Sequence, residues 1–318
     1  MVAVGHRIVH GGSTFSGPVI INEQILADIA TLEAFAPLHQ PHNLAGIRAA
    51  RVAFADVPHI ACFDTAFHHA QPELNKRFAL PQVLHDAGVR RYGFHGLSYE
   101  SIVAQLAAAK PDAATARVVV AHLGNGASMC AIRDGKSIAT TMSFSPLDGL
   151  PMGTRCGRLD AAVVLHLLQH HGRSADEISQ LLNRESGLLG LSGVSSDMRV
   201  LQASTLPSAR MAIDYFVEHL LRELAGMVAA LRGIDRLVFT GGIGENDAAL
   251  RERVMNGAAW LGIRLDVDAN TNINSDRSER ISAADSKVDV RVMRTNEEAV
   301  IARHAALALG LSPASARL

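Results

Sequence analysis

The sequence has few residues of the kinds that mark nucleic-acid-binding or membrane proteins. Only 4% of its 318 residues are aromatic, and 30 Lys and Arg stand against 31 Asp and Glu, a formal net charge of −1. Scarce aromatics and the lack of a basic surplus disfavour base stacking and binding to phosphate backbones or anionic lipid. No apolar run approaches the ~20 residues that a membrane-spanning helix needs. We therefore expect neither nucleic acid nor a membrane as a partner.

Cysteine is also scarce. Cys62, Cys130 and Cys156 are an odd number, lie far apart and lack metal-binding spacing, so reduced thiols are the simplest interpretation. Residues 1–7 lack the layout of a secretory signal. These features predict a cytoplasmic protein, and the chain length favours about two domains.

Two glycine-rich segments are the most informative features that the sequence does contain. His122–Ser128 follows the β-branched run Val118–Ala121, and Phe239–Asn246 follows Leu237–Val238. Glycine adopts positive φ, lets backbone approach a ligand closely, and turn amides can cradle phosphate. We predict that these segments are glycine loops forming two walls of a nucleotide cleft; two ordinary tight turns are the alternative.

The surrounding pattern predicts an α/β fold with a mixed sheet. Residues 117–142 are expected to form a three-stranded meander whose second turn is Asp134-Gly135. A long helix over about Ser208–Arg232 and a strand over Asp235–Thr240 lead into the second glycine segment. The other expected elements are strands over Ala3–Val9 and Val288–Met293, and helices after Gly157, after an N-cap at Ser174, from residue 250, and over Glu298–Leu309.

A series of motifs runs along nearly the whole chain. In order, they are Gly5-His6-Arg7-Ile8-Val9-His10-Gly11-Gly12, Ala36-Pro37-Leu38-His39, Phe63-Asp64-Thr65-Ala66-Phe67-His68, Arg91-Tyr92-Gly93-Phe94-His95-Gly96, the first glycine segment, Phe144-Ser145-Pro146-Leu147-Asp148-Gly149, Met152-Gly153-Thr154-Arg155-Cys156-Gly157, Ser186-Gly187-Leu188-Leu189-Gly190, Ser195-Ser196-Asp197-Met198-Arg199, the second glycine segment and Arg294-Thr295-Asn296-Glu297-Glu298. From residue 5 to about 305 this series resembles the acetate kinases, of the acetate/butyrate kinase family in the actin-like ATPase superfamily. A first phosphate loop of the form Asn-x-Gly-Ser-Ser-Ser, with which that family begins, has no counterpart here.

The resemblance implies a two-lobed actin-like (ribonuclease H-like) fold with mixed sheets and an incomplete N-terminal lobe. We expect residues 1–66 with 299–318 to form that lobe, and residues 67–298 to form the nucleotide-binding lobe. The resemblance also implies a cleft between the lobes and a homodimer.

The implied reaction is reversible transfer of the ATP γ-phosphoryl group to acetate, which gives acetyl phosphate and ADP. Charge on the transferred group is spread over its equatorial oxygens, so cations and donors around it do most of the catalysis. Arg7 and Arg155 match the arginines that the family places on carboxylate and phosphoryl, a role suited to a bidentate guanidinium. His95 matches the histidine that stabilises the transition state, and His39 and His122 resemble secondary active-site histidines.

Asp64 matches a residue described in the family as a catalytic acid or base. A small carboxylic acid has a pKa of about 4 and is already deprotonated at pH 7, so the acceptor needs no base. We expect Asp64 instead to orient Arg7 or Arg155 through a charge-assisted hydrogen bond.

The resemblance also assigns ligand contacts. Glu297 matches a magnesium-site carboxylate, a chemistry that Mn²⁺ shares; an N-cap at the last helix is the alternative role. The acyl pocket would comprise Val9, Leu38, Phe94 and Pro146. The expected ATP or ADP contacts are His122, Leu123, Gly124, Asn125 and Gly126 at the phosphates, Asp197, Met198 and Arg199 near the ribose and base, and Gly242, Ile243, Gly244, Glu245 and Asn246 under the adenosine.

Other functions remain open at this point. The chain could be a non-catalytic nucleotide-binding remnant, or a propionate or butyrate kinase, because one or two methylenes change binding by only about 1–3 kcal/mol. A sugar or glycerol kinase is disfavoured, since it needs a carboxylate base beside the hydroxyl acceptor.

Overall fold

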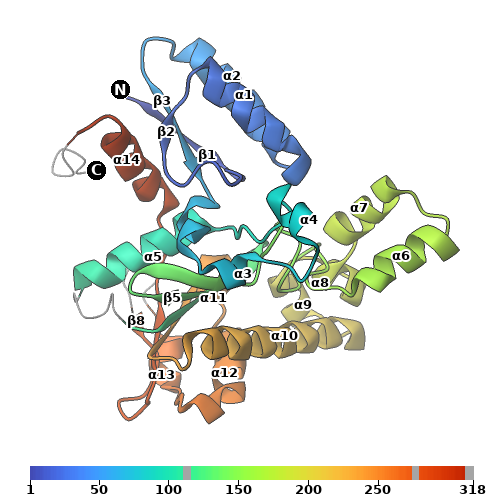
Figure 1. Cartoon of the computed structure of the whole chain (residues 1–318). Helices are drawn as coiled ribbons and strands as arrows, with labels where there is room; N and C mark the ends of the chain where they lie inside the picture. Colours follow the sequence, from blue (N-terminus) through green and yellow to red (C-terminus); the bar gives the residue numbers. More distant parts are fainter. Residues whose placement is uncertain (110–115, 274–278, 312–318) are drawn as a thin grey trace.

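The computed structural model describes residues 1–109, 116–273 and 279–311, which form two β-sheets that share one helix. Figure 1 shows the smaller sheet near the N-terminus, the larger sheet beyond helix α5 (Gly96–Ala109), and the helical hairpin of α6 (Ala161–His170) and α7 (Ala175–Arg184) projecting from the body. Helix α5 packs on one face of each sheet, through Leu97 on the smaller and Ile102 on the larger. It therefore connects the two halves of the molecule.

The smaller sheet has the strand order β1 (Val4–Ile8), β3 (His59–Phe63), β2 (Val19–Ile20). Strand β1 runs parallel to β3, and β2 runs antiparallel to it. One face is covered by α1 (Glu23–Thr31) and α2 (Gln40–Ala53), the other by α5 and α14 (Glu297–Ala308). The parallel pair brings the carboxyl ends of β1 and β3 to the same edge.

The larger sheet is mixed, as the sequence predicts. Its strand order is β6 (Lys136–Thr140), β5 (Ala127–Arg133), β4 (Val118–Leu123), β7 (Arg236–Thr240), β9 (Asp289–Val292), β8 (Glu279–Arg280). The three central strands, β4, β7 and β9, are parallel, and the outer pairs are antiparallel. Both glycine segments therefore leave neighbouring parallel strands at one edge of the sheet.

Helices on the far face of the larger sheet enclose the main hydrophobic core. Helix α10 (Pro207–Leu231) supplies Phe216, Leu220 and Leu224, which pack against buried residues of β4, β5 and β7. The remaining elements are α3 (Glu73–Lys76), α4 (Gln82–Asp86), α8 (Gly187–Ser192), α9 (Met198–Ala203), α11 (Gly241–Asn246), α12 (Ala248–Gly257), α13 (Val267–Thr271) and 3₁₀ turns at Leu32–Phe35, Ala66–Ala70 and Ala259–Leu261.

Most local signals are confirmed. Asp134 (φ 51°) and Gly135 (φ 68°) both adopt positive φ between β5 and β6, the geometry of a tight hairpin turn. Ser174 caps α7 in a reciprocal capping box with Glu177. The predicted long helix is α10, which begins with Pro207 and ends at the left-handed residue Arg232.

Two expectations are wrong in detail. The second glycine segment is not a loop: Gly241, at φ 78°, turns the chain directly from β7 into helix α11, and the Glu245 carboxylate accepts a hydrogen bond from its amide. The last helix is capped by Asn296, whose side chain accepts from the Ala299 amide, and Glu297 is the first helical residue.

The division into two lobes stays a prediction. Helix α14 contacts β1, β3 and α5, so the C-terminal helix lies beside the N-terminal sheet. Residues 312–318 of the expected N-terminal lobe, and residues 110–115 and 274–278 of the other, lie outside the described residues. No helix in the described ranges is long and apolar enough to cross a membrane.

The two ends of α8 allow a matched stability test. Gly187 and Gly193 both have positive φ, but a Cβ on Gly187 would overlap the Met152 carbonyl oxygen, whereas a Cβ on Gly193 meets nothing within 4 Å. We expect Gly193→Ala to cost only the backbone penalty of about 1–2 kcal/mol. Gly187→Ala should lower the free energy of unfolding in urea by about 3 kcal/mol or more. Equal losses would contradict the close approach of α8 to residues 152–155.

Candidate active site

An ion-paired arginine lies where the parallel strands of the smaller sheet end. Arg7 is near the end of β1, and Asp64 directly follows β3. Arg7 Nε donates to Asp64 Oδ1 at 3.0 Å, and Arg7 Nη2 donates to Asp64 Oδ2 at 2.7 Å, a bidentate pair. The Asp64 side chain is almost fully buried, and its negative charge raises the pKa of Arg7. The arginine is therefore held in one orientation.

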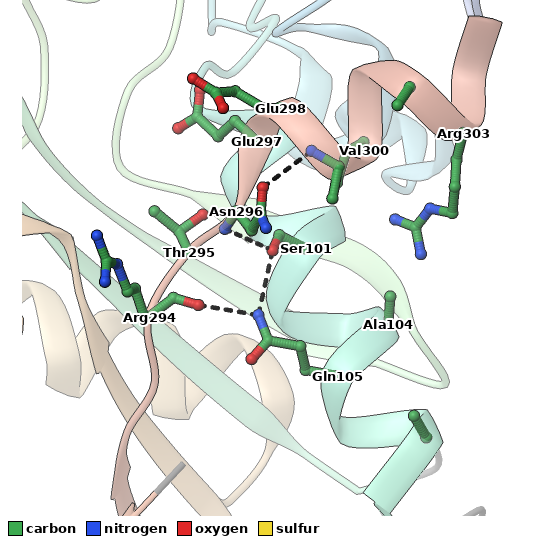
Figure 2. A pocket seen from close by; sticks show the side chains of 13 residues that line it. Ser101, Ala104, Gln105, Arg294, Thr295, Asn296, Glu297, Glu298, Val300 and Arg303 are labelled. Atoms are coloured by element: carbon green, nitrogen blue, oxygen red, sulfur yellow. Dashed lines mark hydrogen bonds between the residues drawn. The ribbon is translucent and has the colours of Figure 1, made fainter. Parts of the chain in front are cut away.

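Glu297 joins this pair from the first turn of α14. Its Oε2 lies 3.3 Å from Arg7 Nη1, and burial raises the pKa of Glu297 while the charge of Arg7 opposes that rise. Glu297 lies beside a groove between α5 and α14 (Figure 2), and the volume of this groove is about 1070 Å³. The backbone amide of Asn296 donates to Ser101 Oγ at 2.9 Å, and Gln105 Nε2 donates to the Arg294 carbonyl at 2.9 Å. These bonds to α5 fix the position of Glu297.

Two neutral histidines, His95 and His122, lie close enough to Arg7 for its charge to act on both rings. The rings of His95 and His122 stack with centroids 4.3 Å apart, and burial lowers the pKa of both, that of His122 to about 4. His95 has a left-handed backbone (φ 58°), a strained conformation that recurs at functional sites. The next residue, Gly96, donates its amide to the Asp64 carbonyl at 2.8 Å.

Serine hydroxyls orient both rings. Ser128 Oγ lies 2.8 Å from His95 Nδ1 and contacts the Tyr99 hydroxyl, and Ser98 Oγ lies 2.8 Å from His122 Nδ1. When Ser128 donates to Nδ1, the proton of neutral His95 is on Nε2, which faces Gly126. Ser98, Ser128 and Tyr99 were not predicted as site residues; the only signal was that Ser128 ends the first glycine segment.

Arg155 differs from Arg7 in having no acidic partner. Its Nη1 donates to the Pro146 carbonyl at 3.1 Å and lies 3.4 Å from Met152 Sδ. Among residues 1–109, 116–273 and 279–311 no carboxylate pairs with it, and burial lowers the pKa of Arg155. A Cβ placed on Gly126 would lie 3.6 Å from Arg155 Nη1 and 3.4 Å from His95 Nε2. The guanidinium therefore faces the same point as His95.

The charges of Arg7 and Arg155 act on the same histidines. Both depress the pKa of His95, after burial and His122, and both contribute to the lowered pKa of His39, where burial is again the main cause. The structure thus gathers Arg7, Asp64 and Glu297 with Arg155 and the three predicted histidines.

The four expected acyl-pocket residues differ in how deeply they are buried and in what they contact. Phe94 is only 1% exposed and belongs to the main core, with Val9 packed against that core. Pro146 contacts Arg155 through its carbonyl, and Leu38 is half-buried beside His39. Phe94 and Val9 are therefore core residues as well as candidates for contact with a small apolar group.

The two glycine segments and residues 196–199 line one cavity of about 560 Å³. Its lining consists of Gly124, Asn125, Ser196, Asp197, Met198, Arg199, Gln202, Gly242, Ile243, Asn246 and Asp247. The segments meet because β4 and β7 are parallel neighbours, with His122 opposite Thr240. Ligands in open α/β sheets bind outside the carboxyl ends of such strands.

Five of the expected nucleotide contacts do not line this cavity. Leu123 is buried in the core, and His122 and Gly126 face the arginines and His95. The carbonyl of Gly244 accepts from Arg251, and the Glu245 carboxylate holds the start of α11. The first glycine segment thus has one side toward the cavity and the other toward the arginines and His95.

The carboxylates of the site differ from those of an all-protein metal cage. No group of three or more His, Cys, Asp or Glu side chains that could hold a metal occurs within the described residues. Glu297 is a single carboxylate already close to Arg7, with Asp64 committed to that arginine. This set does not form an all-protein cage, but it fits Mg²⁺, which keeps waters and takes one or two carboxylates plus substrate phosphates.

Comparison with known proteins agrees with this arrangement. The profile of the acetokinase family matches residues 1–303. The chain is 57% identical over 304 residues to an acetate kinase of Methylocella silvestris, covering 96% of this chain and 74% of the relative. A solved acetate kinase from Porphyromonas gingivalis superposes with a TM-score of 0.90 at 38% identity, over 97% of this chain and 78% of the other.

A solved propionate kinase from Francisella tularensis is equally similar in fold, with a TM-score of 0.89 at 40% identity over 95% of this chain and 78% of that protein. The extent of these matches establishes that this chain belongs to the acetokinase family.

Proposed function

We propose that the chain transfers the γ-phosphoryl group of ATP to acetate, giving acetyl phosphate and ADP, and catalyses the reverse reaction. One observation carries this: Arg155, a half-buried guanidinium without a carboxylate partner among the described residues, faces His95 close to a cavity suited to a nucleotide. A half-buried cation with no counter-charge calls for an anionic ligand. The names of the relatives support acetate as the acceptor.

In the proposed reaction a carboxylate oxygen of acetate forms a bond to the γ-phosphorus, and the bond from that phosphorus to the β,γ-bridging oxygen breaks. The electron pair of the broken bond stays with ADP, and no proton has to move. Arg155 and Arg7 neutralise the carboxylate and the phosphoryl oxygens, and His95 Nε2–H donates to an equatorial oxygen. Because burial keeps His95 neutral at pH 7, it acts as a hydrogen-bond donor.

Asp64 is proposed to orient Arg7. The bidentate contact leaves the carboxylate no free role as a base, and the acceptor needs none. Glu297 is the residue that would hold Mg²⁺, with Mn²⁺ as a possible substitute. When bound to ATP, the metal would neutralise phosphate charge.

We also propose ligand contacts, lobes and an assembly state. Gly124, Asn125 and Gly242–Asn246 would contact the nucleotide with Asp197, Met198 and Arg199; Leu38, Val9, Phe94 and Pro146 would limit the acyl chain. The lobes would be residues 1–66 with the C-terminal helix, and residues 67–298. We propose that the protein is cytoplasmic and forms a homodimer, and the exposed apolar side chains of α6, among them Leu165 and Leu168, support the dimer.

A hydroxamate assay on the purified chain tests the reaction directly. With acetate, ATP and Mg²⁺ we expect acetyl hydroxamate to accumulate in proportion to ADP, and propionate to react with a KM within about 10–200-fold of that for acetate. EDTA should stop the reaction. ATP binding without hydroxamate would instead support a non-catalytic remnant, and faster turnover of propionate would favour the propionate kinase alternative.

Asp64→Asn tests the orienting role. The amide keeps the size of the side chain but loses the charge, so Arg7 is held less firmly and kcat should fall about 10²-fold. Because no proton transfer is removed, the pH–rate profile should keep its acidic limb unchanged. An acidic limb that shifts or disappears in the variant would restore Asp64 as a base.

Gly242→Leu tests the nucleotide cavity. Gly242 lines the cavity on helix α11, and a Cβ there meets nothing within 4 Å, so the variant should fold normally while its side chain fills the cavity. We expect the KM for ATP to rise at least about tenfold, a cost of about 1.4 kcal/mol, with little change in the KM for acetate. Gly226→Leu is the matched control: this exposed glycine in α10 also has open space and lies outside the cavity lining. A normal KM for ATP in Gly242→Leu would place the nucleotide elsewhere.

A further inference from the structure

Arg155 is carried by a long segment without helix or strand, residues 141–160 between β6 and α6. Within it, residues 149–158 form a closed loop, here called the arginine loop. The Arg158 amide donates to the Gly149 carbonyl at 2.9 Å at its base, and the Met152 amide donates to the Arg155 carbonyl at 3.0 Å at its tip. A Cβ on Gly157 would lie 2.6 Å from the Leu150 carbonyl, so the two sides of the loop are in close contact.

The tip of the arginine loop is held by backbone bonds to neighbouring helices. The Leu188 amide donates to the Met152 carbonyl at 2.9 Å, the Ser186 amide donates to the Thr154 carbonyl at 3.0 Å, and the Cys156 amide donates to the Leu182 carbonyl at 3.0 Å. These bonds come from the end of α7 and the start of α8. They do not hold the base of the loop.

The base is held by an ion pair that the proposed reaction does not use. Glu223, on the core-facing side of α10, is only 5% exposed and lies among Leu220, Leu224 and Met227 of the same helix. Its Oε1 lies 3.0 Å from Arg158 Nη1, and Arg158 Nη2 donates to Oε2 at 3.4 Å. Burial raises the pKa of Glu223, and the positive charge of Arg158 counteracts it.

A buried carboxylate on an apolar helix face is costly and is stabilised only by a well-placed partner. Here the partner is three residues beyond Arg155, at the base of the same loop. Asp148 and Arg91, 3.8 Å apart, also act on Glu223: Asp148 adds to the rise in its pKa and Arg91 opposes it, and Asp148 accepts from Ser143 Oγ at 2.5 Å. The base of the loop thus contacts α10 through an ion pair between a buried carboxylate and an arginine whose side chain is 65% exposed.

We propose that Glu223 is a positioning residue for the reaction: through its ion pair with Arg158 it fixes the base of the arginine loop on α10 and so sets where the Arg155 guanidinium meets the anionic acceptor. This inference rests on the proposed function for its catalytic consequence, but its structural step does not. Glu223 itself touches no substrate.

The test combines steady-state kinetics with a double-mutant cycle. Glu223→Gln removes the charge and keeps the shape, and Arg158→Met removes the partner. Each should raise the acetate KM or lower kcat by about 10–100-fold, with the KM for ATP within about twofold of wild type. Because the two residues act through one another, the double variant should be no worse than the more affected single variant. Arg158→Lys, which keeps the charge, should recover most of the loss.

Asp289→Asn is the matched control for a purely structural effect. Asp289 is a partly buried carboxylate bonded to Arg236 and Arg291 at 2.8 Å, at the end of β9 opposite the glycine segments. The Asp289→Asn substitution should lower the melting temperature, while kcat and the KM values for acetate and ATP stay within about twofold of wild type. If Glu223→Gln behaves in the same way, losing stability with unchanged kinetics, the positioning role is wrong.

Hydrogen exchange separates this inference from the proposed function. In Glu223→Gln, peptides covering residues 149–158 should exchange their amides at least about tenfold faster than in wild type, whereas Asp289→Asn should leave them unchanged. This readout needs no activity, so an inactive wild-type chain would overturn the proposed function and leave the structural step testable. Unchanged exchange in the arginine loop would overturn the inference itself.

Discussion

The site depends on one backbone contact, between the amide of Gly96 and the carbonyl of Asp64. Asp64 directly follows β3, the central strand of the smaller sheet, and Gly96 is the first residue of α5, the helix that packs on both sheets. A Cβ on Gly96 would overlap that carbonyl oxygen, so only glycine permits the approach. The contact ties Asp64, and with it Arg7, to the residue that follows His95, whose own backbone is left-handed. The relative placement of Asp64, Arg7 and His95 therefore depends on this junction.

The two arginines are given different electrostatic environments. Arg7 is paired with Asp64 and approached by Glu297, so much of its charge is neutralised before any ligand arrives. Within the part of the chain that the structure describes, Arg155 has a carbonyl and a thioether, but no carboxylate, within hydrogen-bonding distance. We therefore expect an anionic ligand to be stabilised mainly by the charge of Arg155. Arg7 would supply hydrogen-bond donors held in one orientation. The neutral histidines between them add donors without adding repulsion between cations.

Local patterns in the sequence predicted the strands, the long helix and the hairpin turn, because each depends on neighbouring residues. The glycine segment at 241–246 was misjudged as a loop, since a single residue with positive φ starts a helix there and Glu245 then satisfies its first amide. The motif resemblance named Arg7, His95 and Arg155 but gave no sign of Ser98 or Tyr99. Those side chains matter through contacts across α5 and β4–β5, which a one-dimensional pattern does not contain.

The role of Glu223 cannot be predicted from the sequence for the same reason, because it depends on a long-range contact. Within α10 it interrupts an apolar face and would be taken for a solvent-exposed helix residue, since glutamate is almost never fully buried without a partner. Its partner is 65 residues earlier, in a segment with no regular structure. The motif around Arg155 supplies the guanidinium, but its placement depends on a helix that follows in the chain and carries no motif. Position in this site is therefore set by long-range pairs, and chemistry by local motifs.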